Sequence, residues 1–322
     1  EACSMIGEGG KARGLDIGCN DGTLLKSYPK TFVKFGVDPS DIANEITGDI
    51  CVIKDLFPSL ELESKSGGEK FDVITSIAMF YDLEDPVSFV KEIKKNLAEN
   101  GIWIFEMSYM PMMLEMNSYD TICHEHLEYY SLAVVENILG RAGMKIVRAQ
   151  TNDINGGSIR CHASHENSFK HNKKDYLDGL ASLRQKEFDF ELDTDKPYSN
   201  FQQRIDTHKQ ELTSALKELK KSGKRIHIYG ASTKGNTILQ FWGIDKMIID
   251  YAAERNPDKY GAKTLGTDIP IISEAESRAL KPDYYLVLPW HFKNEFLERE
   301  KETLENGTGF IFPLPIFEIV TK

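Results

Sequence analysis

The sequence predicts an α/β protein with two successive domains, each built on a mainly parallel sheet covered by helices. Three observations support this fold class. The chain has 322 residues, of which 41% are hydrophobic, enough for about two domains with separate cores. Short β-branched segments alternate with amphipathic stretches from residue 14 to residue 164. A second strand, glycine turn and helix begins at residue 224.

The first domain is predicted over residues 1–165. Its strands are expected at residues 14–17, 32–38, 71–77, 101–107, 145–150 and 158–163. Between the third and fourth of these, Val90, Ile93 and Leu97 recur at helical spacing, which indicates a crossover helix. Because the chain begins at Glu1 and reaches its first strand within about a dozen residues, we expect it to be truncated at its start.

Residues 166–222 are predicted to be a linker and a connecting helix, and residues 223–322 a second Rossmann-like domain. The linker is charged and turn-rich, with a short helix near residues 176–188 and a longer one at 201–221. The second domain opens with the strand that begins at residue 224. Its further strands are expected at residues 246–252, 284–289 and 310–312.

Composition excludes several classes of function. The formal net charge of −11 argues against a nucleic-acid partner, since phosphate backbones are bound by clustered Lys and Arg. No apolar stretch reaches the roughly 18 residues of a membrane helix, and no signal-peptide pattern is present, so a cytoplasmic protein with a small-molecule substrate is expected. The cysteines lack the paired spacing of zinc sites, and no metal is predicted; they are Cys3, Cys19, Cys51, Cys123 and Cys161.

The first predicted strand ends in a glycine turn that suits a nucleoside ligand. Asp16 lies at the strand end, and the turn carries Gly18, Asn20 and Gly22. Glycine there allows the backbone to approach a ligand closely. Asp38 follows 20 positions after Gly18, at the end of the next strand, where a carboxylate can accept hydrogen bonds from a ribose diol.

Two more residues are expected to complete this site. Asp49 is placed where a third strand would end, and in methyltransferases with the kind of turn that this one resembles, an acid there commonly contacts the adenine amino group. Gly48-Asp49 also reads as a simple turn. Ser76 lies near the end of the strand at residues 71–77 and is expected at the same edge. Dinucleotide sites use GxGxxG to support a pyrophosphate, whereas here Asn20 occupies the middle glycine position. The pattern therefore favours S-adenosylmethionine over NAD as the cofactor.

A loop after the strand at residues 101–107 gathers titratable and aromatic side chains. It reads Tyr119-Asp120-Thr121-Ile122-Cys123-His124-Glu125-His126-Leu127-Glu128-Tyr129-Tyr130-Ser131. Loops beyond the carboxyl end of a strand are where open α/β sheets bind ligands. Two histidines without a third ligand are weak evidence for a metal. A general base is the better interpretation, because imidazole titrates near neutrality and Glu125 or Glu128 can orient it. A purely structural loop remains an alternative.

The chain resembles the S-adenosylmethionine-dependent C-methyltransferases that act on nucleotide-linked 4-keto-6-deoxyhexoses. The resemblance rests on Ile122-Cys123-His124-Glu125-His126, Asn155-Gly156-Gly157-Ser158-Ile159-Arg160 and Tyr229-Gly230-Ala231-Ser232-Thr233-Lys234, in this order. It extends from about Gly14 to the C-terminus and implies a class I methyltransferase sheet in the first domain. Family members generally begin with a small zinc-binding domain, which this sequence is expected to lack.

The resemblance also implies roles for the residues of the loop. His126 would remove the proton alpha to the sugar ketone with support from Glu125, and His124, Tyr129 or Tyr130 would stabilise the oxyanion. Family members often carry Tyr at the position of Cys123. They often have a His in the loop that here reads Met79-Phe80-Tyr81-Asp82. These departures leave the methylated position, and C- versus O-methylation, open.

The second domain is expected to hold the nucleotide part of the substrate. Amides at a helix N-terminus near Ser232, together with Lys234, suit the diphosphate that the resemblance implies. Tyr229 belongs to the same segment, and Trp290 follows a later strand, where it would stack on a base or pack in the core. Three other functions stay open: an O-methyltransferase, an NAD-dependent oxidoreductase with its cofactor on the Gly230 turn, and a non-catalytic binding protein.

Overall fold

The computed structural model describes residue 5 and residues 11–322, which fold as two compact units. The N-terminal unit consists of the residues up to Pro111, Leu127–Asp153 and Gly157–Glu191. The C-terminal unit consists of Met112–His126, Ile154–Gly156 and Leu192–Lys322. The chain thus passes between the units more than once, whereas the sequence suggested a single passage, through a linker and connecting helix at residues 166–222.

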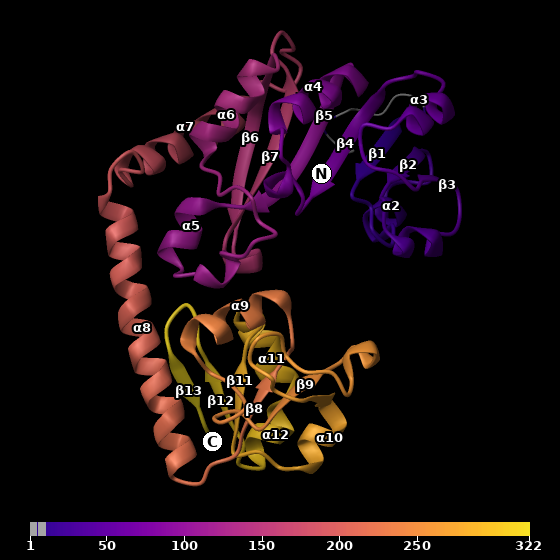
Figure 1. Ribbon diagram of the computed structural model, residues 1–322. Helices are drawn as coiled ribbons and strands as arrows, with labels where there is room; N and C mark the ends of the chain where they lie inside the picture. Colours follow the sequence, from indigo (N-terminus) through magenta and orange to yellow (C-terminus); the bar gives the residue numbers. More distant parts are fainter. Residues whose placement is uncertain (1–4, 6–10) are drawn as a thin grey trace. The chain divides into compact units, whose positions relative to one another are not determined.

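The N-terminal unit is built on a sheet with the strand order β3-β2-β1-β4-β5-β7-β6 in its described part (Figure 1). Its strands are β1 (Arg13–Ile17), β2 (Val33–Val37), β3 (Ile50–Ile53), β4 (Phe71–Ile77), β5 (Leu97–Ser108), β6 (Met144–Asn152) and β7 (Ser158–His165). Strands β1 to β5 pair in parallel, and β7 pairs antiparallel with both β5 and β6. The strand order reverses between β1 and β4, where open α/β sheets bind ligands at their carboxyl ends.

Helices flank this sheet and bury their apolar faces. They are α2 (Thr23–Ser27), α3 (Leu60–Ser66), α4 (Pro86–Asn96), α6 (Leu132–Arg141) and α7 (Lys174–Asp189). Helix α4 begins where the side chain of Asp85 accepts a 3.0 Å hydrogen bond from the Ser88 amide, with Pro86 at the first helical position. Beneath the helices, Trp103 and Phe105 of β5 stack with ring centroids 4.0 Å apart.

Helix α7 was expected as part of a linker, but it belongs to the N-terminal unit and packs on β6 and α6. Its buried Glu187 accepts a hydrogen bond from the Tyr109 hydroxyl at 2.7 Å. The same carboxylate accepts hydrogen bonds from the Leu132 and Ala133 amides at the start of α6. The segment appears polar in sequence because most of α7 is exposed and one of its two buried side chains, Glu187, is an acid that binds the first amides of another helix.

The C-terminal unit has a second sheet with the order β10-β9-β8-β11-β12-β13 (Figure 1). Its strands are β8 (Ile226–Tyr229), β9 (Tyr251–Glu254), β10 (Ile271–Ser273), β11 (Tyr284–Val287), β12 (Gly309–Phe312) and the antiparallel β13 (Glu318–Val320). Its helices include α8 (Lys196–Lys221), α9 (Thr233–Trp242), α10 (Glu274–Ala279), α11 (Lys293–Arg299) and α12 (Lys301–Glu305). Here the order reverses between β8 and β11.

The prediction of two α/β units on mainly parallel sheets is confirmed. Strands β3, β10 and β13 were not predicted. The strand expected at residues 246–252 begins instead at Tyr251, because residues 246–248 form a turn and Ile249, although fully buried, lies outside the sheet. Within the described residues, no helix has the length and apolar character needed to cross a membrane.

Candidate functional site

The turn after β1 has the backbone that its glycines predict. Gly18 and Gly22 both have φ of 73°, and Asn20 between them has φ of 49°. These left-handed conformations are accessible to Gly and tolerated by Asn, which accounts for the residues found there. The Gly18 amide donates a 2.8 Å hydrogen bond to the Val37 carbonyl, so the turn is tied to the end of β2.

Asp38 lies directly after β2 and is 7% exposed. Its Oδ2 accepts a 2.8 Å hydrogen bond from the Asn20 amide, and its Oδ1 accepts from the amide and hydroxyl of Ser40. Burial raises the pKa of Asp38, but these hydrogen bonds outweigh burial and hold the pKa below its usual range. The carboxylate is therefore ionised at neutral pH and suited to accept hydroxyl groups of a ribose.

Asp16 lies within β1 and is 3% exposed. Burial raises its pKa to about 7, against the opposing effect of a 2.6 Å hydrogen bond from the Thr75 hydroxyl and with a small contribution from Asp38. Its charge at neutral pH therefore depends on whether a cation lies close by. The methionine end of S-adenosylmethionine carries an ammonium and a sulfonium. A carboxyl group that ionises beside a cation therefore fits the predicted cofactor.

Asp49 does not lie at the predicted edge of the sheet, and Ser76 lies near that edge with its hydroxyl engaged in the core. Strand β3 begins at Ile50, so Asp49 lies at the amino edge of the sheet, opposite the glycine turn. Ser76 is fully buried, and its hydroxyl accepts a 3.0 Å hydrogen bond from the Trp103 indole inside the core. The acid that follows the carboxyl end of β3 is Asp55, which is exposed. Sequence reasoning missed it because β3 was not predicted.

The loop at residues 112–126 belongs to the C-terminal unit. Its 3-10 helix η3 (Tyr119–Thr121) packs against α9, and a hydrogen-bond chain fixes it there. The Trp242 indole donates to the Tyr119 hydroxyl at 2.7 Å, and that hydroxyl is 2.7 Å from Nδ1 of His208. Because Nε2 of His208 bonds the Pro313 carbonyl, which only accepts, Nδ1 is the acceptor for Tyr119.

Asp120 is the most deeply buried acid of this loop, with 2% exposure. Its Oδ2 accepts a 2.9 Å hydrogen bond from the Trp290 indole, and its Oδ1 has no hydrogen-bond partner among the described residues. Burial raises its pKa, opposed by the Trp290 hydrogen bond and the charge of Lys234. Trp290 itself is 3% exposed. Of the two alternatives for Trp290, packing in the core therefore agrees with the structure better than stacking on a base, and the indole holds Asp120 by its hydrogen bond.

His126 is half-buried, while His124 and Glu125 are exposed. A hydrogen bond to the backbone of Thr121 orients the His126 ring. Burial and the charge of Lys234 lower its pKa, and the Thr121 hydrogen bond and Glu125 only partly offset them. The imidazole is thus largely unprotonated at neutral pH, as a general base must be. Glu125 acts on it through its charge, while the orienting hydrogen bond comes from the backbone.

Tyr130 belongs to the N-terminal unit and is 3% exposed. Its ring lies against Phe80 with centroids 5.4 Å apart, and its hydroxyl has no hydrogen-bond partner among the described residues. Burial raises its pKa to about 12, with a contribution from Glu128. The phenol therefore stays protonated at neutral pH.

Three side chains at and after the end of β8 have different contacts. Ser232 caps α9 by accepting a 3.1 Å hydrogen bond from the Gly235 amide. The Tyr229 hydroxyl donates to Glu300 at 2.9 Å and accepts from Arg278 at 2.8 Å, so only its ring can contact a ligand. Lys234 is half-buried, and its charge acts on Asp120, His126 and His291.

His291 shares this environment. Burial and Lys234 lower its pKa to about 4, and its Nδ1 has no hydrogen-bond partner among the described residues. No group of three potential metal-ligating side chains occurs in the part of the chain that the structure describes. Because the charge of Lys234 acts on all three others, a polar cluster within the C-terminal unit consists of Asp120, His126, Lys234 and His291. Sequence reasoning had singled out two of these residues, His126 and Lys234.

Two family models match successive parts of the chain. Residues 153–315 match the family described as C-methyltransferase C-terminal domain, and residues 7–149 match the family described as methyltransferase domain. The C-methyltransferase NovU of Streptomyces niveus is 30% identical over 236 residues, which are 73% of this chain and 55% of that protein.

A tRNA U34 carboxymethyltransferase of Campylobacter jejuni is 28% identical over 142 residues, 40% of this chain and 48% of that protein. The chain spans about half the length of these two relatives. A solved S-adenosylmethionine-dependent methyltransferase from Clostridium acetobutylicum aligns with 15% identity and a TM-score of 0.39, over 48% of this chain and 84% of that one.

Proposed function

Because this chain belongs to the C-methyltransferase family, whose C-terminal domain makes up half of it, we propose that it transfers a methyl group to a carbon atom of a small acceptor. S-adenosylmethionine is the donor. The Gly18–Gly22 turn and Asp38 hold its adenosine part, and Asp16 lies on the strand that leads into that turn. Bound there, it supplies an electrophilic methyl group on a sulfonium.

The acceptor that fits best is a 4-keto-deoxysugar linked to a nucleoside diphosphate. A carbon next to a ketone becomes a nucleophile only when its proton is removed, and the ketone makes that proton acidic. His126 takes the proton, the freed electron pair forms the new carbon–carbon bond, and the methyl–sulfur bond breaks with its electrons left on sulfur. The observation that carries this proposal is the half-buried His126, oriented by the Thr121 backbone and kept unprotonated by burial and Lys234.

Lys234 supports the same step. Its charge acts on His126, Asp120 and His291, which favours a position near the reacting end of the acceptor. A cation there lowers the energy of the enolate oxygen that forms as the proton leaves. With Lys234 at the reacting end, the diphosphate that was expected to bind Lys234 must be bound by another group of the C-terminal unit. Tyr130, with its free hydroxyl hydrogen, is a second candidate donor to the oxyanion.

Hydrogen exchange tests the proposed chemistry directly. Incubation of the protein with a nucleoside diphosphate-linked 4-keto-6-deoxyhexose in heavy water, without methyl donor, should introduce deuterium alpha to the ketone. Addition of labelled donor should then give a product whose methyl group is bound to carbon. An O-methyltransferase would give a methyl ether and would need no exchange. A methyl ether formed without deuterium exchange would therefore contradict the proposal.

Replacement of Asp38 with alanine should weaken binding of S-adenosylhomocysteine by about 1 to 3 kcal/mol, since a buried ribose hydroxyl would lose its acceptor. Calorimetry measures this affinity. Asp49→Ala removes an exposed carboxylate at the other edge of the sheet and is the matched control, with unchanged affinity expected. Equal affinities of Asp38→Ala and Asp49→Ala, with both variants folded, would rule out Asp38 as a ligand of the donor.

A further inference from the structure

The glycine segment at residues 154–156 closes against two buried side chains of the C-terminal unit. Gly156 ends the 3-10 helix η4 (Ile154–Gly156) and has φ of 84°. A Cβ on Gly156 would lie 2.6 Å from Oγ of Ser118 and 3.2 Å from the ring of Trp290. The Ser118 hydroxyl donates a 2.9 Å hydrogen bond to the Gly156 carbonyl. Glycine is therefore required here, because the loop and the indole both pack onto its Cα.

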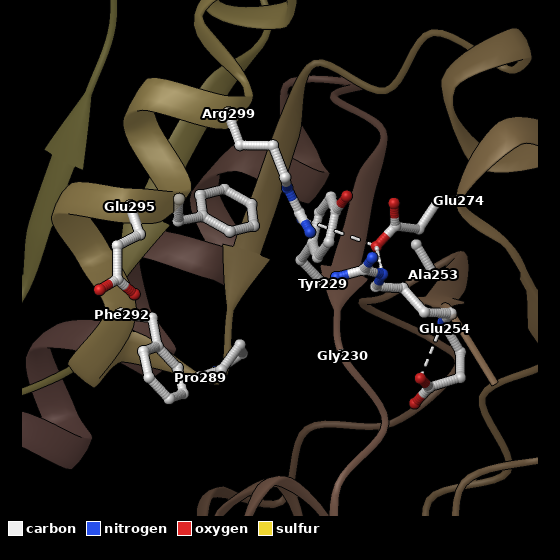
Figure 2. A pocket seen from close by; sticks show the side chains of 11 residues that line it. Tyr229, Gly230, Ala253, Glu254, Glu274, Pro289, Phe292, Glu295 and Arg299 are labelled. Carbon is white, nitrogen blue, oxygen red and sulfur yellow. Dashed lines mark hydrogen bonds and ion pairs between the residues drawn. The ribbon is translucent and has the colours of Figure 1, made fainter. Parts of the chain in front are cut away.

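Trp290 is placed by the turn that follows β11. It begins the 3-10 helix η6 (Trp290–Phe292), directly after Pro289. Figure 2 shows Pro289 and Gly230 in the wall of one pocket, and a Cβ on Gly230 would meet Cδ of Pro289 at 3.2 Å. The turns after β8 and β11 thus lie against each other. This packing fixes the indole, whose N–H donates a 2.9 Å hydrogen bond to Oδ2 of Asp120.

The carboxyl group of Asp120 is held at one oxygen only. It is almost fully buried, and Oδ1 has no hydrogen-bond partner among the described residues. Lys234 forms no ion pair among those residues, so its charge acts on Asp120 from beyond ion-pair distance. An ionised Asp120 would be a buried anion with one hydrogen bond from a neutral indole, which is unfavourable. The carboxyl group therefore keeps its proton, and burial raises its pKa accordingly.

Asp120 and the proposed base belong to one short segment. The His126 ring is hydrogen-bonded to the backbone of Thr121, the residue next to Asp120. The ionisable groups of this region come from the segment itself and from α8, α9 and η6, and they are Tyr119, Asp120, His126, His208, Lys234 and His291. Burial lowers the pKa of all three histidines. Lys234 is therefore the only cation among these groups at neutral pH.

We propose that Asp120 is a positioning residue that controls how far the charge of Lys234 is available to His126 and to the acceptor. While Asp120 is neutral, the ammonium is not paired with it, keeps His126 unprotonated and stabilises the enolate oxygen. When Asp120 releases its proton to solvent, the carboxylate attracts the ammonium and withdraws that stabilisation. The inference rests on the proposed function. It also gives the packing of Trp290 and Gly156 a purpose, because that packing holds Asp120 beside the base.

Replacement of Asp120 with asparagine separates the two states, because the amide still accepts from the Trp290 indole but cannot ionise. The acid limb of kcat/KM, set by His126, should be the same in Asp120→Asn and the wild type. The ratio of variant to wild-type kcat/KM should rise from about 1 at pH 6 to about 5 or more at pH 10. In a Lys234→Met background that rise should shrink below about two-fold. Asp206→Asn removes an exposed charge from α8 and should follow the wild type.

NMR titration needs no acceptor and keeps this test separate from the proposed chemistry. In the wild type, the Asp120 carboxyl should titrate above the usual range of aspartate, and higher still in Lys234→Met. The pKa of His291, lowered to about 4, and that of His126 should not change in Asp120→Asn, because one neutral group replaces another.

A fall of either histidine pKa in Asp120→Asn would show that Asp120 is already ionised and would overturn the inference. A rate ratio that stays flat with pH would overturn it as well. Because the carboxyl titration uses the wild type, the test stands even if Asp120→Asn does not fold. Absence of both deuterium exchange and methyl transfer from the wild type would contradict the proposed function, whereas the titrations decide the coupling of Asp120 to Lys234 by themselves.

Discussion

Replacement of His126 with asparagine should lower kcat by about 10² to 10⁴ while the affinity for S-adenosylhomocysteine stays nearly unchanged. The asparagine amide can still bond the Thr121 backbone, so the loop keeps its anchor, but it cannot accept a proton from carbon. Single-turnover methyl transfer and deuterium exchange into the acceptor measure the same proton removal. Both rates should fall together, because one group serves both reactions.

His165→Asn provides the matched control. This histidine is also partly buried, and its Nε2 lies 3.2 Å from the Leu97 carbonyl, a contact that asparagine can imitate. Its replacement should leave kcat within about two-fold. In the wild type, kcat/KM should fall as the pH drops through the lowered pKa of His126, below the ordinary imidazole value. Lys234→Met should move this acid limb to higher pH. Full exchange and turnover in His126→Asn would exclude His126 as the base.

Asp16→Asn should make the ligand-free protein more stable at pH 8 by roughly 3 kcal/mol, with little change at pH 4. The folded-state pKa of Asp16 is raised to about 7, mainly by burial, above the unfolded value of 3.8. A carboxyl with a raised folded pKa stabilises the fold only while protonated. That contribution is complete below pH 3.8 and is lost as the pH rises through 7. The amide has no proton to lose.

Urea unfolding at several pH values measures the effect, and the two stability curves should diverge between about pH 4 and pH 7. Asp49→Asn alters an exposed carboxylate and should follow the wild-type curve. Parallel curves for the wild type and Asp16→Asn would show that Asp16 ionises in the fold without cost. The assay needs the protein free of donor, whose cationic end would favour the ionised form.

The parts that could be predicted from sequence are those fixed by local patterns. Strand β4 was placed at its observed bounds, because Phe71–Ile77 is a β-branched run between polar residues. The position of Asp38 beside the glycine turn could also be predicted, since an acid 20 positions after the first glycine of such a turn has a defined place in this type of sheet. Strand β3 has only four residues, and without it Asp49 was assigned to the wrong edge.

Contacts between distant parts of the chain explain the remaining misses. Asp120 meets Trp290 across 170 positions, and nothing near either residue in sequence indicates this hydrogen bond. Strand β9 was expected at residues 246–252 but spans Tyr251–Glu254, so its predicted start was five residues early and its predicted end two residues early. Ser76 reads as a strand-end hydroxyl until the pairing of β4 with β5 brings Trp103 beside it.

The interleaved path of the chain limits how this protein can be divided or recombined. A fragment that begins at Leu192 lacks η3, which supplies Tyr119 and Asp120 to the C-terminal unit. Without them, the indoles of Trp242 and Trp290 lose their acceptors, and each buried donor left unsatisfied costs about 1 to 3 kcal/mol. A chimera that exchanges the C-terminal unit between homologues must therefore transplant three stretches of sequence together, residues 112–126, 154–156 and 192–322, rather than a single C-terminal block.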